Sequence, residues 1–166
     1  PAPAGARVVV LDGGVKPLPI GSADYGAPWN WRIGASSKPA GDPGNFAVTF
    51  APSARGLRPW RPCHARRVNL PGGNIALSWT RRTRAFAGDN WALTEVPLGE
   101  AAEGYEIDIL NGAVVVRSVA GLTAPAFTYT AAMQTADFGA PVPGPLALRI
   151  AQIGALGRGA ILDITL

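Results

Sequence analysis

Arginines and an aromatic residue gather where an alternating apolar stretch ends in the middle of the chain. Arg81, Arg82 and Arg84 follow that stretch directly, and Asp89 and Trp91 come a few residues later. Guanidinium groups form two-pronged hydrogen bonds with carboxylates or phosphates, and an exposed indole stacks on sugars or on another guanidinium. These five side chains therefore form a candidate recognition surface for a ligand or a partner.

The same cluster also has a purely structural interpretation. The segment from Thr80 to Gly104 is long for a connection between strands, and long ordered loops commonly pack on their own domain. Arg81 or Arg84 would then pair with a carboxylate of the chain, and Trp91 would cover the core. The acidic residues that could serve are Asp89, Glu95 and Glu100.

A second aromatic pair lies nearer the start of the chain. Trp29 and Trp31 are two residues apart, so a strand would carry both rings on one face, with Ile33 beside them. One interpretation is a platform on which sugar rings stack. The other is that the rings form the core of a small β unit.

Residues suited to catalysis or metal binding are sparse. Cys63 and His64 are adjacent, and neighbours on a strand point to opposite faces, which makes a poor nucleophile–base pair. His64 is the single histidine, and no group of metal-type ligands accompanies it. Paired glutamates could hydrolyse glycosidic bonds, but these lie among Gly and Pro residues and are better explained as solvated loop charges: Glu95, Glu100, Glu103 and Glu106. We predict no enzymatic activity, no metal site and no cofactor.

The composition indicates many short strands joined by turns. The 166 residues include 21 Gly and 16 Pro spread between short apolar runs, and the 48% hydrophobic content is enough to build a core. No run of a dozen residues keeps helical spacing without an interrupting Gly or Pro. We therefore predict an all-β protein. No apolar stretch is long enough to span a bilayer, so we expect no membrane insertion.

Charge is distributed unevenly along the chain. Residues 1–88 hold twelve Lys or Arg and three Asp or Glu, whereas residues 89–166 hold three and eight, giving net charges of +9 and −5. Arginine accounts for thirteen of the fifteen cationic residues, and it suits protein interfaces better than lysine does. No groove-reading helix or base-stacking motif accompanies the charge. Protein partners are therefore favoured, and we expect no nucleic acid.

The apolar pattern predicts two β units. The first, residues 1–56, holds short strands and little core, and its opening PAPAG resembles a linker, so we expect the chain to be part of a longer polypeptide. The second, residues 57–166, holds seven predicted strands in the manner of an immunoglobulin-like sandwich. Its core should include Trp79, Tyr105 and Ile107. The predicted strands are 63–70, 75–80, 105–110, 114–119, 127–130, 146–153 and 161–166.

This second unit resembles a fibronectin type III domain. The resemblance lies in a buried Trp79 in the second strand, Tyr105 opening the third, a long penultimate strand, and the Gly157-Arg158-Gly159 turn into the last strand. It implies an antiparallel β-sandwich.

A second resemblance covers nearly the whole chain. The blocks LSWTRRTR, GDNW, VPLGE, YEIDIL, TYTAAMQ, ADFG and LRIAQIG occur in that order. They resemble the C-terminal region of the large baseplate or tail-tip protein, also called megatron or host-specificity protein, of gene transfer agents and related long-tailed phages. The upstream elements VVVLDGGVKPLPI, WNWRIG, KPAGDPG, FAVTF and GLRPWRPCHARR are similar to what precedes that region.

The second resemblance implies a non-enzymatic structural component of a virion. The chain would be assembled in the bacterial cytoplasm and reside at the tail tip, contacting other baseplate subunits around a trimeric axis and helping to display the apparatus for host cell attachment. The alternative function is a carbohydrate-binding module that recognises host surface polysaccharide through Trp29, Trp31 or the segment from Arg81 to Trp91.

Overall fold

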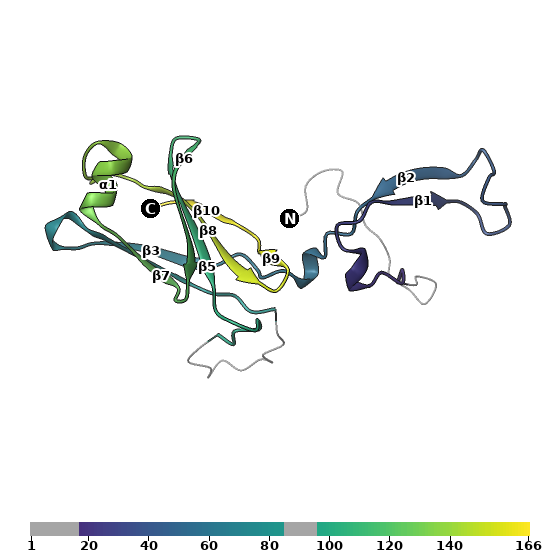
Figure 1. Cartoon of the computed structure of the whole chain (residues 1–166), viewed down its shortest axis with the longest axis horizontal. Coiled ribbons are helices and arrows are strands. Elements are labelled where there is room, and N and C mark those ends of the chain that lie inside the picture. Colours follow the sequence, from purple (N-terminus) through teal and green to yellow (C-terminus); the bar gives the residue numbers. More distant parts are fainter. Residues whose placement is uncertain (1–16, 85–95) are drawn as a thin grey trace, which may run out of the picture. The chain divides into compact units, whose positions relative to one another are not determined.

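The chain divides into two compact units, residues 1–54 and Arg55–Leu166. The computed structural model describes residues 17–84 and 96–166 (Figure 1). The division falls after Ala54, two residues before the boundary that the sequence predicts after Gly56.

The larger unit is a sandwich of two antiparallel sheets. One sheet has the strand order β3-β4-β7 and the other has the order β10-β8-β5-β6, with the two-residue strand β9 paired to β8 (Figure 1). The first, second and fifth long strands thus share one sheet, as in a fibronectin type III domain, and the all-β fold class is confirmed. The strands are β3 Cys63–Asn69, β4 Ile75–Thr80, β5 Tyr105–Asn111, β6 Val114–Leu122, β7 Ala126–Tyr129, β8 Ala147–Gly154, β9 Gly157–Arg158 and β10 Leu162–Thr165.

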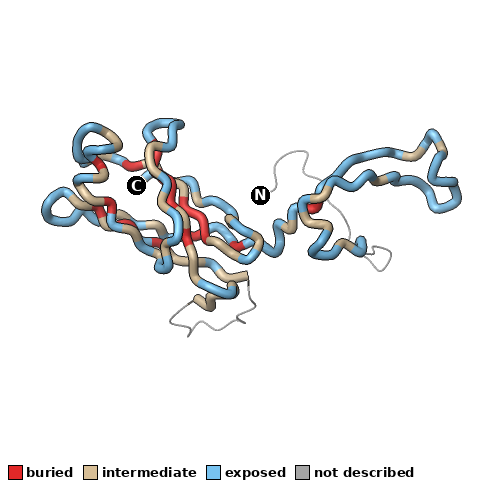
Figure 2. The backbone as a smooth tube through the Cα atoms, in the orientation of Figure 1, coloured by how far each residue is buried: buried red, intermediate tan, exposed pale blue. Residues whose placement is uncertain are grey.

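The core of this unit lies between the two sheets. Ile75, Leu77 and Trp79 alternate with more exposed residues along β4 and are at most 4% exposed. Tyr105 and Ile107 of β5 are fully buried opposite them, and the Trp79 and Tyr105 rings meet edge to face with centroids 5.4 Å apart. The three predicted core residues are therefore confirmed. Figure 2 shows the buried backbone concentrated in the central strands of the sandwich.

A tight turn at Asn111-Gly112 joins β5 to β6. The two strands pair from Tyr105–Leu122 to Asn111–Val114, and Gly112 has a φ of +60°. Asn111 already pairs with Val114, so the two-residue loop is Gly112-Ala113, and glycine adopts the left-handed conformation of its first position without steric cost.

One short helix, α1 (Ala131–Phe138), follows β7, in a stretch where the sequence predicts no strand. Its first turn is capped twice: the Thr130 hydroxyl accepts a hydrogen bond from the Met133 amide at 3.2 Å, and Asn74 Oδ1 accepts one from the Ala131 amide at 2.9 Å. Gly139, with a φ of +82°, ends the helix. Eight residues are too few for a periodic helical signal in the sequence.

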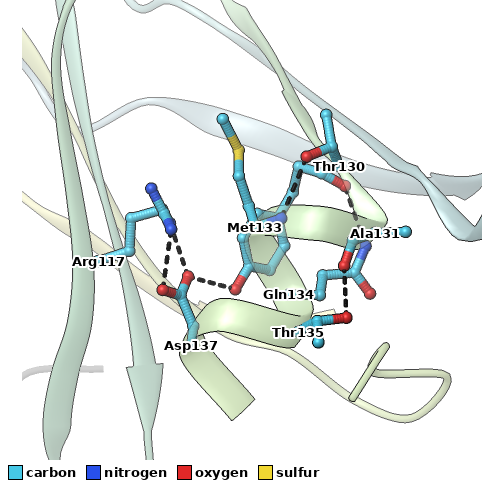
Figure 3. A network of polar contacts seen from close by, with 8 residues as sticks. Arg117, Thr130, Ala131, Met133, Gln134, Thr135 and Asp137 are labelled. Atoms are coloured by element: carbon cyan, nitrogen blue, oxygen red, sulfur yellow. Dashed lines mark hydrogen bonds and ion pairs between the residues drawn. The ribbon is translucent and has the colours of Figure 1, made fainter. Parts of the chain in front are cut away.

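Two polar side chains fix α1 to the sandwich. Gln134 is 1% exposed; its Nε2 donates to the carbonyls of Gly73 and Tyr129 at 2.9 and 3.0 Å, and its Oε1 accepts from the Val142 amide at 2.9 Å. Asp137 is the other anchor, and it faces β6 (Figure 3).

Asp137 joins three elements through its carboxylate. Arg117 of β6 donates to both Asp137 oxygens at 2.6 and 2.9 Å (Figure 3). The buried Tyr129 hydroxyl of β7 also donates to Asp137, at 2.6 Å. Hydrogen bonds from Arg117 lower the pKa of the Asp137 carboxyl more than its burial raises it, and the bond from Tyr129 adds to the effect.

The smaller unit is built around one hairpin. Strand β1 (Trp29–Ile33) pairs antiparallel with β2 (Phe46–Phe50), after a short 3₁₀ helix at Ser22–Asp24. The connection is ordered by its own polar groups: Asp42 accepts hydrogen bonds from the Gly44 amide and from Lys38 Nζ. Within the described ranges, neither unit contains a helix long and apolar enough to cross a membrane.

Candidate partner-binding surfaces

The hairpin of the smaller unit carries an apolar face made by alternate residues of both strands. Directly paired residues on antiparallel strands project to the same side, so three pairs build this face. They are Trp29–Phe50, Trp31–Val48 and Ile33–Phe46. We call these six residues the hairpin face.

Most of the hairpin face is exposed. Five of its six side chains are between 37% and 64% exposed, including Trp29 at 40% and Phe46 at 64%. The Trp29 and Trp31 rings stack on each other with centroids 5.7 Å apart and planes 21° apart. The opposite side of the hairpin is polar, and there Thr49 donates a hydrogen bond to Asn30 at 2.7 Å. The hairpin is therefore amphipathic, and the two tryptophans do not form an enclosed core.

Arg81 and Arg84 are engaged within the larger unit. Arg81 donates to the carbonyl of Val96 at 2.7 Å and to Glu103 at 2.9 Å. Arg84 forms a two-pronged pair with Glu100, whose side chain is 3% exposed. This pairing is the structural interpretation that the sequence offered for Arg84, and it ties the segment after β4 to the residues before β5.

The Arg81 pair extends into the core through Tyr105. The Tyr105 hydroxyl donates a hydrogen bond of 2.7 Å to Glu103 Oε1, the oxygen that also accepts the hydrogen bond from Arg81. Burial raises the pKa of Tyr105 well above its ordinary value, and the Glu103 carboxylate adds to this rise. The hydroxyl therefore stays protonated and serves as a fixed donor.

Arg82 differs from its two neighbours because it contacts an aromatic ring. Its guanidinium carbon lies 5.1 Å from the centroid of the Trp60 ring, which is the geometry of a cation–π contact. Trp60 remains 45% exposed. The other two members of the predicted cluster, Asp89 and Trp91, lie outside the described residues.

A groove of about 660 Å³ lies beside Trp60 in the larger unit. One wall comes from the 3₁₀ helix at Arg55–Leu57 and the proline-rich segment after it, and the other comes from β9 and the residues that follow. The Ala160 amide donates to the Pro59 carbonyl at 3.0 Å and holds the walls together. The lining residues are Arg55, Gly56, Arg58, Pro59, Trp60, Arg158, Gly159 and Ala160. We call this site the arginine groove.

Sequence patterns alone did not predict the arginine groove. Arg55 lies just before the predicted boundary between the two units, and Arg58 just after it. The walls come from segments about a hundred residues apart, so no local spacing reveals them. The available signal was Trp60 between two prolines and two arginines, in the run Arg58-Pro59-Trp60-Arg61-Pro62.

Cys63 and His64 are adjacent residues at the start of β3. Cys63 is half-buried, while His64 is exposed with a φ of +50°, at a point where the register between β3 and β4 shifts. In the part of the chain that the structure describes, no three His, Cys, Asp or Glu side chains gather in a way that could hold a metal ion.

No protein-family model matches the chain, and no curated protein matches it at a significant level. Among solved structures, the chain is similar to domains d3-d4 of the rat CD45 extracellular region, with 10% identity and a TM-score of 0.45 over 97% of this chain and 74% of that one. It is also similar to a structure described as a myokine, with 12% identity and a TM-score of 0.41 over 65% of this chain and 95% of that one.

A third similar structure is the FN5 domain of Drosophila Lar, with 17% identity and a TM-score of 0.37 over 65% of this chain and 94% of that one. At these low identities and TM-scores, the strand order of the two sheets carries the fold assignment.

Proposed function

We propose that this chain is a non-enzymatic structural module that attaches to another protein subunit through the hairpin face. The observation that carries the proposal is the exposure of five of the six apolar side chains on that face. A two-stranded hairpin is only marginally stable by itself, and an exposed aromatic patch marks an interaction site. Docking on a partner supplies the missing layer.

A protein partner fits the hairpin face better than a glycan does. All six side chains of the face are hydrocarbon or indole, so the face offers almost no groups to sugar hydroxyls, which need hydrogen-bond partners when they are buried. Trp29 and Trp31 also cover part of each other by stacking. Aromatic side chains of this kind are typical anchors in protein–protein interfaces. On the hairpin face, the exposed part of the Trp29 ring favours the glycan alternative.

The assembly that we propose is the tail tip or baseplate of a phage-like particle such as a gene transfer agent. Its support is the ordered set of seven sequence blocks from LSWTRRTR to LRIAQIG. In such a particle the chain would contact other baseplate subunits around the tail axis, and the sandwich would act as a spacer that displays the adsorption apparatus. The proposed partner of the hairpin face is one of those subunits.

The test is binding between the purified chain and purified baseplate subunits. Replacing Phe46 and Phe50 with serine removes two exposed rings from the hairpin face and should weaken the complex at least about tenfold. The matched control is Val114→Ser with Val115→Ser in β6, where both side chains are also more than a third exposed. This control should bind like the unmodified chain, with circular dichroism confirming that each variant folds.

Two results would count against the proposal. One is unchanged affinity of the folded F46S/F50S variant. The other is binding of purified envelope polysaccharide that F46S/F50S abolishes, because that result would make the hairpin face a glycan platform.

A further inference from the structure

The arginine groove is a second surface that attachment through the hairpin face does not use. It lies wholly within the larger unit, and its lining combines three arginines with one exposed indole. Such a combination of concavity, charge and an aromatic ring is characteristic of a ligand site.

The cationic charge of the groove is only partly neutralised. Arg158 pairs with Asp108 at 2.6 Å and with Glu106 at 3.4 Å. Among the described residues, Arg55 and Arg58 have no carboxylate within ion-pair distance, and Arg82 approaches the groove through its contact with Trp60. Arg55 and Arg58, with Arg82 behind the indole, therefore leave the site positive. A guanidinium group is a planar fork of donors that binds carboxylate or phosphate in two-pronged fashion.

Two backbone amides on the β9 side of the groove are already paired, which leaves the exposed arginine and indole side chains as the main recognition groups. The Ala160 amide donates to Pro59, and the Gly159 amide donates to Gln152 at 2.9 Å. A peptide ligand commonly adds its main chain to a strand edge or lays the apolar face of a helix in a groove, and neither mode would use the exposed indole and the guanidinium groups together. A compact ring that carries an anionic group fits better, because its flat face can stack on Trp60 while its charge meets the arginines.

We propose that the arginine groove binds an anionic saccharide. In this assignment Trp60 stacks on the sugar ring, and Arg55 and Arg58 bind its carboxylate or phosphate. Arg82 holds the Trp60 indole in place through the cation–π contact. The site differs from the tryptophan pair and the central loop that the sequence singled out, sharing only Arg82 with them.

The experiment is calorimetric titration of the whole chain with oligogalacturonate, which carries carboxylates, and with a phosphorylated mannan. Neutral dextran is the uncharged control. At least one of the two anionic saccharides should bind, and dextran should not. R55Q/R58Q should weaken binding at least about tenfold, because each lost charge-assisted hydrogen bond is individually strong. Trp60→Ala should weaken it as well. The two ligands distinguish a carboxylate site from a phosphate site.

The matched control is R32Q/R66Q, which removes the same charge from two exposed arginines outside the groove. It should change the affinity by no more than about twofold. Equal losses in R32Q/R66Q and R55Q/R58Q would overturn the proposal in favour of diffuse electrostatic attraction. If polyglutamate binds more tightly than the saccharides and Trp60→Ala does not change its affinity, the proposal is overturned and the ligand is an acidic peptide. Failure of the folded chain to bind either anionic saccharide would also overturn it.

Discussion

At the scale of single residues, Asp137 shows how a nearly buried carboxylate is accommodated in this sandwich. Asp137 accepts hydrogen bonds from Arg117 and Tyr129, and its side chain is 8% exposed. A buried carboxylate is costly unless it is paired in this way. Local sequence patterns could not reveal the pair, because Arg117 and Asp137 lie on different elements.

The Asp137 network predicts a pH dependence of stability. Because the folded-state pKa of Asp137 lies below its unfolded value, the carboxylate stabilises the fold at pH values above the unfolded pKa of about 3.9. This contribution is lost as the pH falls through the folded-state pKa. Urea unfolding between about pH 6 and pH 2 should show a smaller loss of the free energy of unfolding in D137N than in the unmodified chain.

The control for this prediction is D163N. Asp163 pairs with Arg149 at 3.0 Å, but its side chain is 68% exposed, so its pair is expected to contribute little. D163N should follow the unmodified chain across the pH series. A D137N profile that is parallel to the unmodified one would show that the network does not couple stability to pH.

At the scale of elements, local sequence predicts the strands well and the helix poorly. The alternation of Ile75, Leu77 and Trp79 fixes which face of β4 is buried, and Asn111-Gly112 marks the turn between β5 and β6. Helix α1 instead depends on tertiary contacts, including the cap that Asn74 provides from a distant loop. The sequence did contain its local end signals, namely Thr130 before the helix and Gly139 after it.

The candidate sites were predictable to different degrees, because some features depend on local strand geometry and others depend on contacts between distant segments. The shared face of Trp29 and Trp31 follows from strand geometry, but whether another layer covers it depends on tertiary structure. The pairing of Arg84 with Glu100 was one of the alternatives that the sequence offered. The arginine groove depends on contact between two distant segments, so the sequence alone could not place Arg55 beside Arg158.

Gln134 should be the most sensitive anchor of α1. Replacing it with leucine keeps a similar size but leaves two carbonyls and one amide without their partner, namely those of Gly73, Tyr129 and Val142. We expect the free energy of unfolding to fall by about 3 kcal/mol, measured by urea denaturation.

Thr135→Ala provides the comparison on the same helix. The Thr135 hydroxyl makes one exposed bond to the Ala131 carbonyl, so its loss should cost no more than about 0.5 kcal/mol. Equal costs for Q134L and T135A would mean that the buried hydrogen bonds of Gln134 contribute nothing net.

At the scale of the whole molecule, the two units differ in how they are stabilised. Every member of the buried hydrophobic core cluster belongs to the sandwich, from Ile75 to Ile150. The hairpin of the smaller unit exposes its apolar face instead. The sandwich therefore has the means to fold by itself, whereas the hairpin gains from a partner.

This difference predicts that residues 55–166 fold when produced alone. The fragment should unfold in one cooperative transition, and its midpoint should lie within about 4 °C of the corresponding transition in the whole chain. Thermal scans followed by far-ultraviolet circular dichroism would measure both. A fragment that is unfolded, or that melts much earlier, would show that residues 1–54 contribute to the stability of the sandwich.

The different surroundings of the described tryptophans have an optical consequence. Trp79 is 4% exposed and packs against Tyr105, whereas Trp29 and Trp60 are 40% and 45% exposed. Among these three, a soluble quencher reaches Trp29 and Trp60 first and leaves the blue-shifted emission of Trp79. No attached dye is needed. Quenching of the red-edge emission reports whether the hairpin face and the arginine groove are occupied, and the blue-shifted emission of Trp79 reports whether the sandwich is folded.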